Sequence, residues 1–124
     1  MAKLDVLLVA PPTKTHRTPE ENLGAQLLTS IAKENGYTAK YLDCWVNNIN
    51  TKKAVNLILN LNPKVVGFSV SMDSIGQTIE LAKKLRHQNY KGYLTLGGVY
   101  ATFEAERLLR HYPGLFNGVI IGEA

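Results

Sequence analysis

The chain has 124 residues, of which 45% are hydrophobic and 19% charged, and these proportions fit one soluble globular domain with a single core. No apolar run approaches the roughly 20 residues that span a bilayer, and the first residues show no signal-peptide pattern, so we expect a cytoplasmic protein. Its single cysteine, Cys44, excludes an internal disulfide and an iron–sulfur site made by this chain alone. The net charge of +4 is spread out, which favours solvated helix ends over a nucleic-acid face.

In the first half of the chain, short apolar segments alternate with amphipathic ones. The pattern predicts a strand over 3–9, which Ala10-Pro11-Pro12 ends, then a helix over 20–35, a strand over 38–43 and a helix over 51–61. The first helix carries four apolar residues at helical spacing, namely Leu23, Leu27, Leu28 and Ile31. We expect this stripe to face the sheet.

The segment from Lys64 to Met72 is almost wholly apolar until its last residues. It is too short and too rich in β-branched residues for a helix, so it predicts a parallel strand that is buried on both faces at the centre of a sheet. Ser69 and Ser71 come at its end and project to the same side. Because ligands bind at the carboxyl ends of the strands in open α/β sheets, these hydroxyls indicate a ligand site, although serines there also bond to nearby backbone.

The second half continues the alternation. Ser74 and Gln77 form a capping-box pattern at the start of a third helix, and a fourth strand is expected over 93–96. Gly97-Gly98 ends that strand, after which Thr102 would cap a helix over 103–111, and a fifth strand is expected over 118–121. Paired glycines at a strand end either make a tight turn or let a ligand approach the backbone, since no Cβ intervenes.

Five strands joined by helices of crossover length predict an α/β fold of the doubly wound type. We expect a flavodoxin-like (Rossmann-like) parallel sheet with strand order 2-1-3-4-5, whose switch point lies between the first and third strands. The helix that normally follows the fifth strand in this fold is missing. We therefore expect either a domain cut from a longer polypeptide or a partner that covers that face.

Several segments together resemble the cobalamin-binding domain of cobalamin-dependent radical S-adenosylmethionine enzymes. They are Pro11-Pro12, the run from Val66 to Ser71, the run from Leu96 to Thr102 and the run from Val119 to Glu123. The resemblance covers essentially the whole chain, so residues 1–124 are expected to form one such domain, as the amino-terminal part of a longer enzyme or on its own. Its most specific part is the pairing of two serines with two glycines, which is similar to the motif that holds the nucleotide tail of cobalamin in the wider family.

The resemblance implies that the chain binds cobalamin base-off, with the tail detached from cobalt and inserted between the strand ends. The cofactor-binding residues that it implies are Pro12, Thr13, Ser69, Val70, Ser71, Met72, Gly97, Gly98, Val99, Tyr100, Gly122 and Glu123. No catalytic residue is implied in this chain, because the cofactor carries the reaction.

The loop after the first strand bears on the lower ligand of cobalt. The wider family has an Asp-x-His-x-x-Gly loop there, whereas this chain has Lys14-Thr15-His16-Arg17-Thr18-Pro19. His16 matches, but the acidic residue and the glycine are absent, and a ligating imidazole normally needs an acceptor that orients it. We therefore expect no histidine ligand and keep His16 as the alternative cobalt ligand.

The implied partner is a radical S-adenosylmethionine domain, in cis or in trans, which would carry the iron–sulfur cluster and S-adenosylmethionine and would use cobalamin for methyl transfer. No nucleic acid or membrane partner is expected. Two other classes stay open: a ligand-free interaction module of the same fold, and a flavin-binding electron carrier, whose phosphate loop Thr13, Thr15 and Thr18 would match loosely. A phosphoacceptor receiver domain is set aside, because it needs acids where this chain has Pro11-Pro12 and Ser69-Val70-Ser71.

Overall fold

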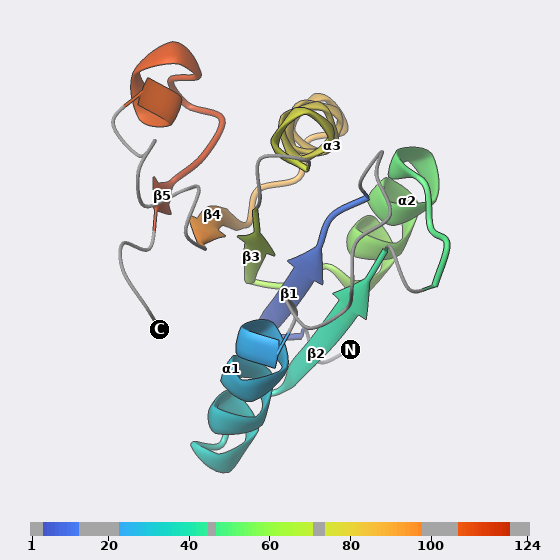
Figure 1. Cartoon of the computed structure of the whole chain (residues 1–124), viewed down its shortest axis with the longest axis vertical. Helices are drawn as coiled ribbons and strands as arrows, with labels where there is room; N and C mark the ends of the chain where they lie inside the picture. The colour runs from blue at the N-terminus through green and yellow to red at the C-terminus, as the bar shows by residue number, and fades with distance from the viewer. Residues whose placement is uncertain (1–3, 13–22, 45–46, 71–73, 98–106, 120–124) are drawn as a thin grey trace.

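A computed structural model of the chain shows a five-stranded parallel sheet with strand order β2-β1-β3-β4-β5 (Figure 1). The structure describes residues 4–12, 23–44, 47–70, 74–97 and 107–119. Within these ranges the strands are β1 (Val6–Ala10), β2 (Ala39–Asp43), β3 (Val65–Ser69), β4 (Tyr93–Gly97) and β5 (Gly118–Val119). The helices are α1 (Leu23–Glu34), α2 (Thr51–Leu61) and α3 (Ile75–His87), and residues 107–111 are also helical. The flavodoxin-like order predicted from the sequence is confirmed.

The main core lies on one face of the sheet. Alternate residues of a strand share a face, and the residues that point to this face are fully or almost fully buried: Leu7 and Val9 of β1, Val66 and Phe68 of β3, and Leu94 and Leu96 of β4. They form one cluster with the inward residues of α2 and α3, which lie together on this side of the sheet (Figure 1). The apolar character of β3 is therefore explained by its central position.

The opposite face is covered differently. Helix α1 lies on this side and packs on β1 and β2 (Figure 1). The β3 and β4 residues that point to this face become small or polar towards the carboxyl end, with Gly67 and Ser69 on β3 and Thr95 and Gly97 on β4. The two faces therefore differ in kind, since one is a packed apolar core and the other offers small side chains on its central strands.

The orientation predicted for α1 was wrong in part. Leu27 is 57% exposed and Ile31 is 44% exposed, whereas Thr29 is buried and Leu28 and Ala32 are half-buried. The apolar side chains of α1 cover a wider arc than the sheet can bury. Only the side of the helix that carries Leu28 and Ala32 packs on β1 and β2. The side chain of Leu23 lies outside the described residues.

The capping box predicted at the start of α3 is also corrected. Ser74 does occupy the N-cap position, but its backbone has φ −112° and ψ −5°, and its side chain makes no capping bond. A cap of that kind needs extended backbone at the N-cap residue. The first turn is held by Thr78 instead, whose backbone N–H and hydroxyl both donate to the carbonyl of Ser74, at 2.9 and 2.8 Å.

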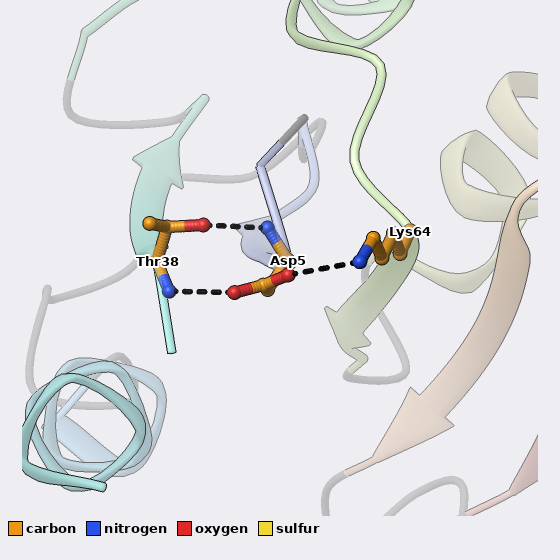
Figure 2. Close-up of polar contacts among 3 residues, drawn as sticks. All are labelled: Asp5, Thr38 and Lys64. Atoms are coloured by element: carbon orange, nitrogen blue, oxygen red, sulfur yellow. Dashed lines mark hydrogen bonds and ion pairs between the residues drawn. The ribbon is translucent and has the colours of Figure 1, made fainter. Parts of the chain in front are cut away.

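A polar clasp ties together three strands at the amino edge of the sheet (Figure 2). The backbone N–H of Asp5 donates to the Thr38 hydroxyl at 2.9 Å, and the N–H of Thr38 donates to Asp5 Oδ2 at 2.9 Å. Lys64 Nζ lies 3.4 Å from the other carboxylate oxygen. These residues precede β1, β2 and β3, so the clasp fixes the edge opposite to the strand ends at which ligands bind.

Because the clasp contains the Asp5 carboxylate, we expect the stability of the fold to depend on pH. The hydrogen bond from the Thr38 backbone, aided by the Thr38 hydroxyl and Lys64, lowers the pKa of Asp5 from its ordinary value of 3.8. A lowered folded-state pKa contributes stability that is present above pH 3.8 and is lost as the pH falls through the folded-state pKa. We expect Asp5→Asn to melt below the wild type at pH 7 and to match it at pH 2, as measured by circular dichroism. An equal deficit at both values would show that the charge is not what matters.

The connection from α3 to β4 and the approach to β5 are joined by Arg86. Its guanidinium donates to the carbonyls of Tyr90, Gly92 and Leu115, at 3.0, 2.8 and 3.3 Å, and to the side-chain oxygen of Asn117 at 2.7 Å. The same Asn117 oxygen accepts the backbone N–H of Leu94 at 2.8 Å. A planar guanidinium with several N–H donors in fixed directions suits this junction better than an ammonium would. These hydrogen bonds connect the start of β4 to the segment before β5.

Candidate functional site

The last residues of four neighbouring strands form a row across the carboxyl edge of the sheet. Ala10 pairs with Asp43, and Ser69 pairs with Gly97. Because Val9 pairs with Phe68, the next residues, Ala10 and Ser69, also lie beside each other. We call Asp43, Ala10, Ser69 and Gly97 the edge row. Adjacent strands lie about 4.8 Å apart, so the row spans about 14 Å, and its side chains point to the α1 face.

The β3 and β4 half of the edge row combines a hydroxyl with bare backbone. Ser69 and Gly97 are both half-buried, and the backbone ladder continues past them through a bond from the Val70 N–H to the Gly97 carbonyl at 2.9 Å. Since Gly97 has no Cβ, a flat group can approach its backbone next to the Ser69 hydroxyl. The sequence prediction that these two residues lie together is confirmed by the strand register.

One row further from the edge, the same face continues with Gly67 and Thr95. A Cβ on Gly67 would lie 2.8 Å from Leu8 Cδ2 and 3.5 Å from the Thr95 hydroxyl, so no side chain fits there without displacing Leu8. The Thr95 hydroxyl donates to the Val66 carbonyl at 3.3 Å. Gly67 and Thr95 are buried while Ser69 and Gly97 are half-buried, so this small-residue floor, made of Gly67, Ser69, Thr95 and Gly97, becomes more open towards the carboxyl edge.

The other residues predicted for the cofactor are placed as follows. Pro12 is half-buried just after β1, and the side chain of Val70 lies in the core, on the side opposite to Ser69. Nine of the predicted site residues lie outside the described ranges: Thr13, His16, Ser71, Met72, Gly98, Val99, Tyr100, Gly122 and Glu123. Among the described residues, no group of three histidine, cysteine, aspartate or glutamate side chains is arranged to hold a metal ion.

Sequence reasoning missed Asp43 at the β2 end of the edge row. Asp43 is only 6% exposed, and the Tyr41 hydroxyl donates to its Oδ2 at 3.0 Å. Burial, and then the charge of Asp43, raises the pKa of Tyr41, and the same two causes raise the pKa of Cys44 to about 12. The signal in the sequence was an acid as the last residue of a strand that pairs with the first one.

Comparison with known proteins bears on the fold and on the family. A solved structure described as a DNA-binding response regulator of the LuxR family from Staphylococcus aureus is similar to this chain, with a TM-score of 0.65 and 16% identity. The match covers 98% of this chain and 88% of that one, and at this identity it shows the fold alone. No curated protein matches the chain.

Part of the described chain separates it from a receiver-like site. Ala10 ends β1 and Pro11 and Pro12 follow it, where that class of protein places acids, and β3 ends at Ser69 rather than at an aspartate. No described helix is long and apolar enough to cross a membrane.

A family model for the B12 binding domain matches residues 13–124, which is most of the chain. The chain therefore belongs to the B12-binding domain family.

Proposed function

We propose that the chain binds cobalamin base-off and presents it to a radical S-adenosylmethionine domain for methyl transfer. Membership of the B12-binding domain family supports the choice of cofactor. The observation that carries the proposal is the pairing of Ser69 with Gly97 at the carboxyl edge, because a half-buried hydroxyl lies there beside backbone that carries no Cβ. The residues present therefore fit the nucleotide tail of cobalamin.

The small-residue floor has the properties that a detached tail requires. Gly97 exposes its backbone to a ring face, and the Ser69 hydroxyl can donate a hydrogen bond to the free nitrogen of the dimethylbenzimidazole. Gly67 and Thr95 lie deeper and are buried, and the side chain of Leu8 lies next to Gly67, so the tail would contact mainly Ser69 and Gly97. With the tail held there, the corrin would lie over the carboxyl edge, where open α/β sheets bind their ligands.

The composition of the chain indicates which parts of the proposed reaction it can supply and which parts a partner domain must supply. When bound, cobalamin supplies the methyl-transfer chemistry, and the protein supplies binding and orientation. A chain with one cysteine cannot provide the thiolates of an iron–sulfur cluster. The cluster and S-adenosylmethionine are therefore assigned to the partner domain, in cis or in trans.

The direct test is retention of the cofactor. Purified protein is incubated with hydroxocobalamin and passed through a gel-filtration column, and the visible spectrum of the protein peak is recorded. We expect a coloured peak with a base-off spectrum, and no retention of flavin mononucleotide under the same conditions. A colourless protein would favour the ligand-free interaction module, and a yellow protein with flavin would favour the electron carrier.

A further inference from the structure

Asp43 is a buried carboxylate on the same edge of the sheet as the proposed cofactor. It is the last residue of β2 and is 6% exposed. Burying an ionised carboxylate is costly unless it is hydrogen-bonded. Tyr41 supplies one such bond, at 3.0 Å. A carboxylate has lone pairs for about four donors, so it can serve a ligand as well as its protein partners.

The position of Asp43 in the edge row decides which part of a ligand can reach it. Two strand spacings, about 10 Å, separate it from Ser69, with Ala10 between them. Helix α1 packs on β1 and β2. A ligand on the small-residue floor therefore cannot reach Asp43 along the face of the sheet, because α1 lies in between. A group that contacts both Asp43 and Ser69 must therefore lie over the edge row and span most of it.

We infer that Asp43 is a cofactor-binding residue that accepts hydrogen bonds from amide N–H groups on the rim of the corrin, at the end of the edge row opposite to Ser69 and Gly97. This inference rests on the proposed function. The corrin of cobalamin is the broad part of the ligand and carries carboxamides around its rim, whereas the tail is narrow and enters the floor. An ionised carboxylate is an acceptor only, and it forms stronger hydrogen bonds than a neutral acceptor does. The two ends of the row thus bind different parts of one molecule.

The test compares two ligands that share the corrin but differ in the tail. Hydroxocobalamin has both parts, and dicyanocobinamide has the corrin and its carboxamides without the nucleotide tail. Equilibrium dialysis of each, read by corrin absorbance, gives the Kd for the wild type, Asp43→Asn, Ser69→Ala and Tyr41→Phe. We expect Asp43→Asn to weaken both ligands by about tenfold or more, since the rim amides would then meet a neutral acceptor that carries an N–H donor group of its own. Ser69→Ala should weaken hydroxocobalamin only.

Tyr41→Phe is the matched control, because it removes the neighbouring hydroxyl and keeps the carboxylate. It should bind both ligands within about threefold of the wild type, and Asp43→Glu should recover most of the affinity that Asp43→Asn loses. Loss of hydroxocobalamin alone in Asp43→Asn, or no loss of either ligand, would overturn the inference. An equal loss in Tyr41→Phe would also overturn it, since the effect would then belong to local packing. Failure of the wild type to bind either ligand would overturn the proposed function instead.

A measurement on the wild type covers the case in which Asp43→Asn does not fold. Dicyanocobinamide is compared with dicyanocobyrinic acid, in which the rim amides are replaced by carboxylic acids. The net charge of +4 favours the acid over the amide at long range, so a local preference for the amide is diagnostic. We expect the amide to bind at least tenfold more tightly. Equal or tighter binding of the acid would contradict a carboxylate acceptor.

Discussion

Gly97→Val is expected to weaken cobalamin binding by between about tenfold and 100-fold, because a side chain in the space that the tail would occupy has an overpacking cost of about 1–3 kcal/mol. Gly97 lies beside Ser69 in the edge row. It is not one of the glycines with positive φ in the described chain, which are Gly36 and Gly114. Valine therefore suits the strand backbone of β4, and the variant should fold while its side chain occupies the floor. The Kd for hydroxocobalamin, measured by equilibrium dialysis, checks this result.

Two controls separate a blocked floor from a damaged protein. Gly97→Ala adds one methyl group and should give an intermediate loss. Dicyanocobinamide lacks the tail and should bind Gly97→Val about as well as it binds the wild type. If Gly97→Val keeps full affinity for hydroxocobalamin while its circular dichroism spectrum is native, the tail does not lie on Gly97. The tail-binding site proposed at the small-residue floor would then be wrong.

The largest expected effect on stability is that of Gly92→Ala. A Cβ at Gly92 would overlap the phenol of Tyr90. That phenol is 4% exposed and donates to the Pro63 carbonyl at 2.5 Å, which links the end of α3 to the start of β3. The phenol must move, so the variant adds an overpacking cost to a lost buried hydrogen bond. We expect a loss of about 2–4 kcal/mol in the free energy of unfolding.

Gly76→Ala provides the matched control in the same helix-to-strand unit. Nothing lies within 4 Å of a Cβ at Gly76, which is exposed in the first turn of α3. Alanine there should raise stability by about 0.5–1 kcal/mol, because it restricts the unfolded chain and favours the helix. Urea denaturation followed by circular dichroism measures both variants. Equal stabilities for Gly92→Ala and the wild type would mean that the Tyr90 ring has room to move.

Most of the fold could be predicted because local patterns and topology agree. Five strands with crossover-length connections leave few parallel orders, and the apolar run around Phe68 identifies the central strand. The juxtaposition of Ser69 and Gly97 followed from the same logic, since both residues end strands that are adjacent in the 2-1-3-4-5 order. Sequence reasoning worked where a feature depends on strand order alone.

Sequence reasoning was less reliable for features that depend on how side chains pack, such as the orientation of a helix or the cap at its start. Helical spacing correctly groups Leu27 and Ile31 on one side of α1, but it does not say how much of a wide apolar arc the sheet will cover. The pattern at Ser74 and Gln77 suits a cap, yet the backbone of Ser74 is not extended and the hydroxyl of Thr78 bonds its carbonyl instead. Asp43 was not singled out, because one acid at a strand end gains meaning only when its neighbours in the sheet are known.

The likeness to a response regulator illustrates why fold and function must be argued separately. The two chains share an architecture at 16% identity, and one architecture supports many sites. The functional argument for this chain rests on local features: prolines after β1, and a serine paired with a glycine at the ends of β3 and β4. These residues favour a binding site for a flat ligand over a phosphoacceptor site built around an aspartate.

The most direct test of the account is the electron paramagnetic resonance spectrum of cob(II)alamin bound to the purified chain. A tail that lies on the Gly67, Ser69, Thr95 and Gly97 floor cannot coordinate cobalt, so the spectrum should lack the nitrogen splitting that an axial base gives. Splitting that disappears in His16→Ala would assign the lower ligand to His16 and leave the tail detached. Splitting that persists in His16→Ala would show the dimethylbenzimidazole still bound to cobalt, and that result would contradict the proposed site.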